Sequence, residues 1–184
     1  MKKLGFCVLA LAMWTGPSVK GAVVLLDFEA ATSVEVLPFV EDGFELSVDT
    51  FAAVFATGFG FPMTGNPTDY VAFEETATIT LALEAGGAFD LNQVTIGPND
   101  FAAAATIEII MTGNLEGGGT VMQTFSGLTT ATVVNPVGFN DVTRVTFTTS
   151  DDAGLDNFSL EVIPEPSFSA LLLASLSFCL RRRR

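Results

Sequence analysis

The feature that most constrains the fold is an alternation of apolar and polar residues that repeats at every second position. It marks the stretches Phe44 to Val48, Ala77 to Glu84, Ala105 to Met111, Val142 to Thr148 and Leu155 to Ile163. Successive side chains of a strand point to opposite faces of a sheet, so this pattern is typical of half-buried strands. Gly, Asn, Asp and Pro separate the stretches, as expected of turns. We therefore expect an all-β fold of roughly nine or ten strands that form a single antiparallel β-sandwich.

One turn is indicated by Glu116 followed by three glycines, Gly117 to Gly119. This run lies between two strand-like segments, 107–112 and 120–126, and it is interpreted as a flexible hairpin tip. A glycine triplet can also hold a phosphate group. That alternative is disfavoured because no Lys follows the glycines and no helix begins after them.

The N-terminus has the three parts of a secretory signal peptide. Lys2 and Lys3 supply positive charge, residues 4–14 are apolar, and small residues follow at Gly21 and Ala22. These features predict export and removal of residues 1–21. Residues 22–163 then form one domain that is long enough to bury a core.

The C-terminal segment 164–184 has a different character from the rest of the chain. Pro164, Glu165 and Pro166 precede an uncharged, mostly apolar run, and the chain ends with four arginines, Arg181, Arg182, Arg183 and Arg184. Four arginines are costly to bury but suit the cytoplasmic face of a membrane. This order of motifs resembles the PEP-CTERM sorting signal of Gram-negative bacteria. The resemblance implies that an exosortase, a membrane transpeptidase, cuts near Pro-Glu-Pro and passes the protein to the cell surface or the exopolysaccharide matrix.

The apolar run is shorter than a full membrane span. It comprises the thirteen residues from Phe168 to Leu180, and as a helix it reaches only about 20 Å, whereas a span needs roughly 20 residues. Flanking residues and arginine side chains that extend to the interface close part of the gap. The alternative to a sorting signal is a hydrophobic C-terminal helix that stays as an unprocessed membrane anchor.

The charge of the domain excludes several classes of partner. Residues 22–163 contain one basic residue, Arg144, and twenty acidic residues, which gives a formal charge of −19. Such a field repels nucleic acid and anionic lipid, and it favours solubility and divalent cations. We therefore expect no nucleic-acid partner.

The absence of two residue types excludes further chemistry. The chain has no histidine, and its two cysteines, Cys7 and Cys179, both lie in the terminal segments. Histidine-based general bases, Ser-His-Asp and Cys-His nucleophiles and most zinc or copper sites are thereby excluded. No disulfide is expected within the domain.

The domain itself resembles the jelly-roll sandwiches of secreted surface proteins and of carbohydrate-binding modules. The resemblance rests on residues 26–29 (Leu-Asp-Phe-Glu), 89–94 (Phe-Asp-Leu-Asn-Gln-Val) and 154–160 (Gly-Leu-Asp-Asn-Phe-Ser-Leu). It implies that the first and last strands are neighbours and that a structural calcium ion joins them. Asp27, Glu29 and Asp156 match the calcium positions, and oxygen ligands of this kind suit the ion. The alternative is that Asp156 caps a strand and Glu29 faces water.

Two other groups of residues are weaker candidates for a site. The Phe- and Gly-rich segment 51–61 and the turn after it suggest a ligand face of Phe59, Phe61, Asn66, Asp69 and Tyr70, although burial of the phenylalanines in the core is favoured. The acidic pairs at 41–42 and 74–75 are interpreted as solvated charge, because adjacent strand residues point to opposite faces and cannot flank one glycosidic bond.

These observations together predict an exported, non-enzymatic protein. The expected function is that of an exosortase-sorted cell-surface or matrix protein with a structural or adhesive sandwich. It would be held briefly at the inner membrane before its release. The alternative is a secreted carbohydrate-binding module, stabilised by calcium, whose partner is exopolysaccharide or another glycan.

Overall fold

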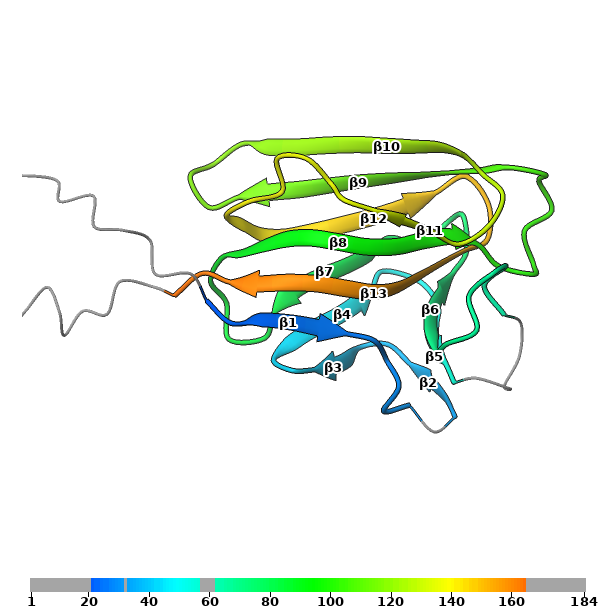
Figure 1. Cartoon of the computed structure of the whole chain (residues 1–184), viewed down its shortest axis with the longest axis horizontal. Helices are drawn as coiled ribbons and strands as arrows, with labels where there is room; N and C mark the ends of the chain where they lie inside the picture. Colours follow the sequence, from blue (N-terminus) through cyan, green and yellow to red (C-terminus); the bar gives the residue numbers. More distant parts are fainter. Residues whose placement is uncertain (1–20, 32, 57–61, 165–184) are drawn as a thin grey trace, which may run out of the picture.

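A computed structural model describes residues 21–31, 33–56 and 62–164. These residues form thirteen β-strands and no helix (Figure 1), and every strand pairing is antiparallel. The expected all-β class is thus confirmed. Apart from Gly21 and Pro164, the predicted signal peptide and sorting segment lie outside the described residues.

Within those ranges, no helix is long and apolar enough to cross a bilayer.

All thirteen strands are connected by pairing, but they fold into two layers, each of which is referred to as a sheet. The first has the order β3 (Phe39–Glu41), β4 (Phe44–Val48), β7 (Ile79–Leu83), β12 (Val142–Thr149), β9 (Ile107–Leu115) and β10 (Thr120–Leu128). The second has the order β2 (Val34–Val36), β5 (Ala52–Phe55), β6 (Tyr70–Phe73), β13 (Ala153–Val162), β8 (Phe89–Pro98) and β11 (Thr132–Val134). β1 (Val23–Leu26) pairs with the C-terminal half of β13, and the single pair Val142–Phe89 joins the two sheets.

The core lies between the sheets because one face of each long strand is apolar. In β9, Ile107, Ile109 and Met111 are buried while the residues between them are partly exposed. Phenylalanines fill the centre: the ring of Phe158 packs edge-to-face on Phe28 at 6.0 Å and on Phe147 at 5.7 Å. This geometry directs the positive ring edge at a negative ring face.

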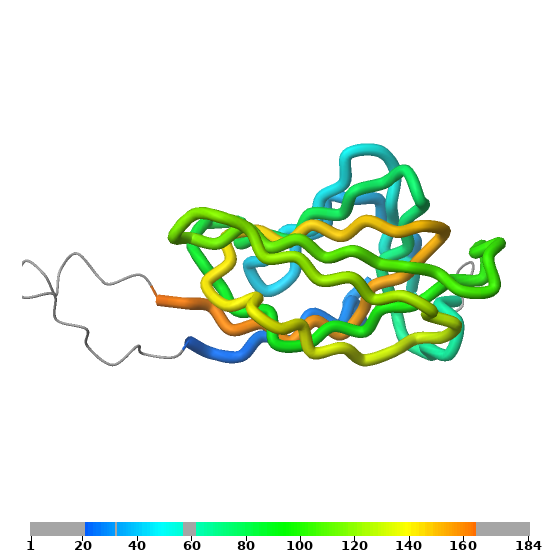
Figure 2. Tube along the Cα trace, turned by 90° about the horizontal axis from the view of Figure 1, so that it is seen from above, coloured from blue at the N-terminus to red at the C-terminus, as the bar shows by residue number. Residues whose placement is uncertain are grey.

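The first and last strands are neighbours, as the jelly-roll resemblance implied. Val23 pairs with Glu161 and Leu26 with Phe158. Both ends of the described chain therefore leave the sandwich at one pole (Figure 2). The opposite pole is formed by the far end of β8 and the segment before β6 (Figure 1). A ten-residue strand such as β8 separates the two poles by about 33 Å.

The predicted hairpin is confirmed, since β9 and β10 pair directly and the three glycines lie at the turn between them. The expected number of strands was too low. The short strands β2, β3 and β11 have three residues each, too few to show an alternation. β5 and β6 are buried along nearly their whole length and therefore do not alternate either.

Candidate functional site

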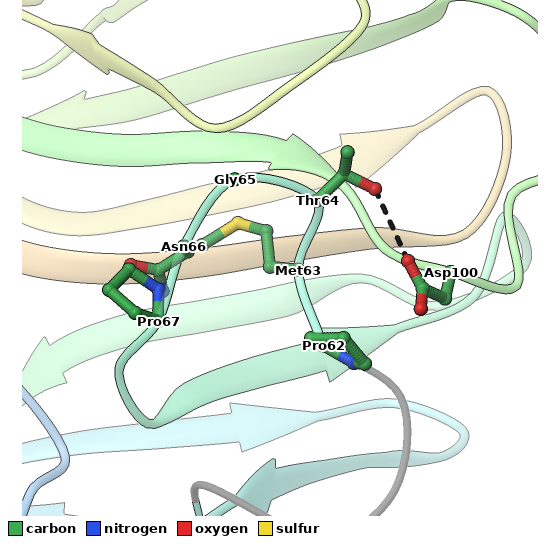
Figure 3. A pocket seen from close by; sticks show the side chains of 7 residues that line it. All are labelled: Pro62, Met63, Thr64, Gly65, Asn66, Pro67 and Asp100. Atoms are coloured by element: carbon green, nitrogen blue, oxygen red, sulfur yellow. Dashed lines mark hydrogen bonds between the residues drawn. The ribbon is translucent and has the colours of Figure 1, made fainter.

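A depression at the pole away from the chain ends is the candidate site. It is shallow and open to solvent, has a volume of about 490 Å³, and is lined by Pro62, Met63, Thr64, Gly65, Asn66, Pro67 and Asp100 (Figure 3). Thr64 and Asp100 are exposed, and the Thr64 hydroxyl donates to Asp100 Oδ1 at 3.4 Å. The two prolines add exposed apolar rings beside these polar groups. Its volume is within the range of small-ligand sites.

Backbone hydrogen bonds fix the shape of the depression. The N–H of Thr64 donates to Pro98 O at 2.9 Å, and the N–H of Asp100 donates to Pro62 O at 3.1 Å. Gly65 has a φ of +83°, and a Cβ there would lie 2.7 Å from the Thr130 hydroxyl. Because left-handed φ and tight contact both favour glycine, this turn is specified by its sequence.

Asp156 holds Asn66, one of the residues that line the depression, in place. Its side chain is 0% exposed, and Oδ2 accepts from Asn66 Nδ2 at 2.8 Å, Thr68 Oγ1 at 2.7 Å and Asn157 Nδ2 at 2.7 Å. Oδ1 accepts from the Asn157 backbone N–H at 2.6 Å. Four donors thus converge on one carboxylate and tie the Asn66 turn to β13.

The pKa of Asp156 is raised to about 6, mainly by burial, and the negative charge of Glu29 also contributes to this rise. The hydrogen bonds from Thr68, Asn66 and Asn157 act in the opposite direction because they stabilise the ionised form. The carboxylate is therefore ionised at neutral pH and changes its charge under mildly acidic conditions.

The three predicted calcium ligands are brought to the same region. Glu29 is near enough to Asp156 to affect its pKa, and Glu29 Oε1 accepts from the Asp69 N–H at 3.4 Å. Asp27 Oδ1 accepts from the Glu29 N–H at 3.3 Å. The residue between them, Phe28, has a φ of +59° and makes this turn unusual for a non-glycine residue.

Glu41 is a neighbour that sequence reasoning did not include in the calcium set. Its Oε2 accepts from the Phe28 N–H at 3.3 Å. Burial raises its pKa, and Asp27, Asp42 and Asp156 raise it further. The negative charges of these acids therefore repel one another. Within residues 21–31, 33–56 and 62–164, however, no group of three or more such side chains is placed to hold a metal ion.

The residues of the predicted ligand face lie in different surroundings. Asn66 lines the depression. Tyr70 is 3% exposed, and its ring stacks on Phe55 with 5.9 Å between the ring centroids. Asp69 is also buried. Phe59 and Phe61 lie outside the described residues.

Several residues of the depression were missed from the sequence. Thr64, Asp100 and the two flanking prolines were not among the predicted site residues. The Gly65-Asn66-Pro67 and Gly97-Pro98-Asn99-Asp100 turns were the available signals, but nothing in the sequence showed that the chain brings them together. The isolated bridge between Met63 and Asn99 does so.

The fold and this depression define the chain as a jelly-roll-like antiparallel β-sandwich. No protein-family model and no curated protein matches it. Similar solved structures include the C-terminal family 22 carbohydrate-binding module of Clostridium thermocellum Xyn10B, with 11% identity, a TM-score of 0.44, and coverage of 80% of this chain and 98% of that chain. A xylan-binding domain from CBM 22 has 12% identity, a TM-score of 0.42, and covers 80% and 97% of the two chains. TmCBM61, solved with β-1,4-galactotriose, has 12% identity, a TM-score of 0.39, and covers 65% and 88%.

Proposed function

We propose that the chain is an exported cell-surface or matrix protein, delivered by an exosortase-type sorting system, whose sandwich acts in structure or adhesion rather than in catalysis. The observation that carries this proposal is the pairing of β1 with β13, which places both ends of the described part of the chain at one pole. A body attached through its C-terminal end then presents the opposite pole, with the depression, to its surroundings.

The charge distribution supports the same role. The domain carries twenty acids and one arginine, whereas the C-terminal tail carries four arginines. The tail is attracted to an anionic membrane surface, and the acidic domain is repelled from it. In this proposal the tail is a transient membrane partner and the domain faces outward.

Replacement of the motif Pro164-Glu165-Pro166 by three alanines tests the sorting step. The expected result is a chain that keeps its tail, measured by the intact mass of the protein recovered from the cell envelope. The matched control replaces the exposed residues 74–76, Glu-Glu-Thr, by three alanines and should leave tail removal unchanged. Identical processing of the motif variant and the natural chain would contradict an exosortase signal.

Glycan binding at the depression is the second candidate function. Exposed Asp100 and Thr64 offer hydrogen bonds to sugar hydroxyls, while Pro62 and Pro67 offer apolar contact to the C–H faces of a sugar. On a glycan array, Asp100→Ala should weaken binding about tenfold or more, because a charged hydrogen-bond partner is lost. Glu84→Ala, an exposed acid in another turn, is the control. Equal binding by the Asp100 variant would exclude this site.

Calcium remains a proposal for Asp27, Glu29 and Asp156. Their carboxylates and the carbonyls of the Phe28 turn have the oxygen chemistry that calcium prefers. When bound, the ion would supply positive charge among acids that otherwise repel one another.

A further inference from the structure

The segment 117–140 differs in charge from everything around it. It contains no charged residue, whereas the rest of the domain carries all twenty acids. The segment includes β10, β11 and the connection that follows them. Exposed apolar side chains lie in it: Met122 is 67% exposed, Val133 56% and Val137 78%. This segment therefore gives one border of a strongly acidic molecule an uncharged, partly apolar strand. One carboxylate lies beside it, that of Glu108 in β9, which accepts from Ser126 Oγ at 2.6 Å.

β10 forms the edge of the first sheet along this border. It pairs only with β9 among the described strands and lies along the upper border in Figure 1. An edge strand presents backbone N–H and C=O groups to a partner, and natural proteins usually protect long edges with charge, proline or a short length. β2 and β3 are short and carry Glu35 and Glu41, but β10 has nine residues and no charge or proline.

The regular part of β10 has hydroxyl residues at both ends, apolar residues next to them and Gln123 at its centre. Gly119 and Gly127, both with positive φ, delimit it, and the register shifts between Ser126 and Leu128. The residue midway between Thr120 and Ser126 is Gln123. A two-fold axis at this residue places Val121 opposite Phe125 of a second copy and Met122 opposite Thr124 of the second copy.

This register satisfies the requirements of an antiparallel pair. Along β10, the N–H and C=O groups of alternate residues point away from β9. Each residue of this register lies opposite a residue an even number of positions away, so the outward-pointing groups of one copy face those of the other. Val121 and Phe125 are partly buried and pack on the core, so their pairing extends the core across the axis. Aromatic and β-branched residues form favourable cross-strand pairs.

We propose that β10 pairs with β10 of a second copy of this chain and joins two sandwiches through a continuous sheet. The occupant is a second copy because the strand is complementary to itself and because an acidic body can approach another only at a neutral border. β10 and β13 both lie along the long axis (Figures 1 and 2). The two-fold therefore directs the two C-terminal ends in opposite directions, a geometry that suits bridging of two surfaces.

The experiment uses single cysteines in the full chain carrying Cys7→Ser and Cys179→Ser, which otherwise has no thiol. Residues opposite one another across an antiparallel pair lie about 4.5–5.5 Å apart at Cα, within disulfide reach. Under mild oxidation, Gln123→Cys should give a covalent dimer on a non-reducing gel. Ala85→Cys, exposed in the turn between β7 and β8, is the control and should give none.

A mixed pair tests the register. Thr124→Cys alone should cross-link poorly, and mixing it with Met122→Cys should restore the dimer. A Gln123→Cys chain that stays monomeric, that cross-links no better than Ala85→Cys, or that cross-links only to another protein would overturn the proposal.

Gln123→Glu tests the interface without loss of an internal contact. Gln123 Oε1 accepts from the Val137 N–H at 2.9 Å, and a carboxylate retains this acceptor. Two carboxylates facing across the axis should raise the dissociation constant of the dimer about tenfold or more, measured by sedimentation equilibrium of the full chain in non-ionic detergent. Equal association of the variant and the natural chain would overturn the proposal.

Discussion

At the scale of single residues, Asp156 connects stability to pH. Its pKa of about 6 in the folded chain is above the unfolded value of about 3.9. The folded state therefore holds a proton over a pH range in which the unfolded state has lost it. The contribution of Asp156 to the free energy of unfolding is greatest below about pH 4 and decreases as the pH rises through 6. Glu41 and Asp152, whose pKa values are also raised by burial, act in the same direction.

We predict a higher melting temperature at pH 5 than at pH 8, by roughly 3 °C or more. Asp156→Asn should reduce this difference, because an amide does not titrate, and exposed Glu84→Gln should keep it. Calorimetry at both pH values is the measurement. A difference as large in Asp156→Asn as in the natural chain would show that Asp156 is not responsible.

Below pH 4 two other acids cause stability to fall, rather than rise, as the pH decreases. Backbone N–H donors hold the pKa values of Asp49 and Asp151 below their usual range. Their contribution is present above about pH 4 and is lost as pH falls through their folded pKa values. Stability should therefore decline again in strong acid.

Calcium binding would act through the same acids. With calcium in hundredfold excess over its dissociation constant, the melting temperature should rise by roughly 3–8 °C at pH 7.5 and constant ionic strength. Asp156→Asn should abolish the rise. If the natural chain melts at the same temperature with and without calcium, the proposed ion is excluded.

The sequence indicated Asp156 but not its surroundings. Its hydrogen-bond partner Asn66 is 90 positions away in the chain, and Thr68 is equally remote. Local patterns report on local structure, so the carboxylate could be predicted as important while the donors that surround it could not. The same limit applies to Tyr70, which was named for the proposed ligand face because it follows an aromatic, glycine-rich segment, whereas tertiary packing buries it.

At the scale of elements, Gly97 in β8 allows a close approach by the chain before β11. A Cβ at this position would lie 2.8 Å from the backbone N and Cα of Ala131. Gly97→Ala should lower the free energy of unfolding by about 1–3 kcal/mol because the backbone must move. A Cβ at Gly117 would have no atom within 4 Å, so Gly117→Ala should change the free energy of unfolding by less than about 0.5 kcal/mol. Urea unfolding compares the two, and equal effects would contradict this packing.

Long elements were predictable and short ones were not. The alternation in β9 and β12 follows from one face being buried, and the glycine turn specified the hairpin. In β13 only the part from Asp156 to Leu160 alternates in this way, because residues 153–156 are buried on both faces. β2 and β3 are held in place by pairing with β5 and β4 rather than by a pattern of their own. Pairing partners depend on the whole fold, so sheet order could not be read from composition or periodicity.

At the scale of the whole molecule, three features share one geometry. Both ends of the described part of the chain lie at one pole, the depression lies at the other, and the uncharged border runs between them along β10 (Figure 1). A surface protein attached through its C-terminal end would thus expose the depression outward and its neutral edge sideways. The acidity of the remaining surface keeps other approaches unfavourable.

The most direct test of this account is the location of the chain after deletion of residues 164–184. Cells that make the full chain should carry it on their outer surface, accessible to added protease and shorter than the chain that left the cytoplasm. The deleted form should be exported but not retained at the surface. If it is retained at the surface in the same amount as the full chain, sorting by the tail is contradicted.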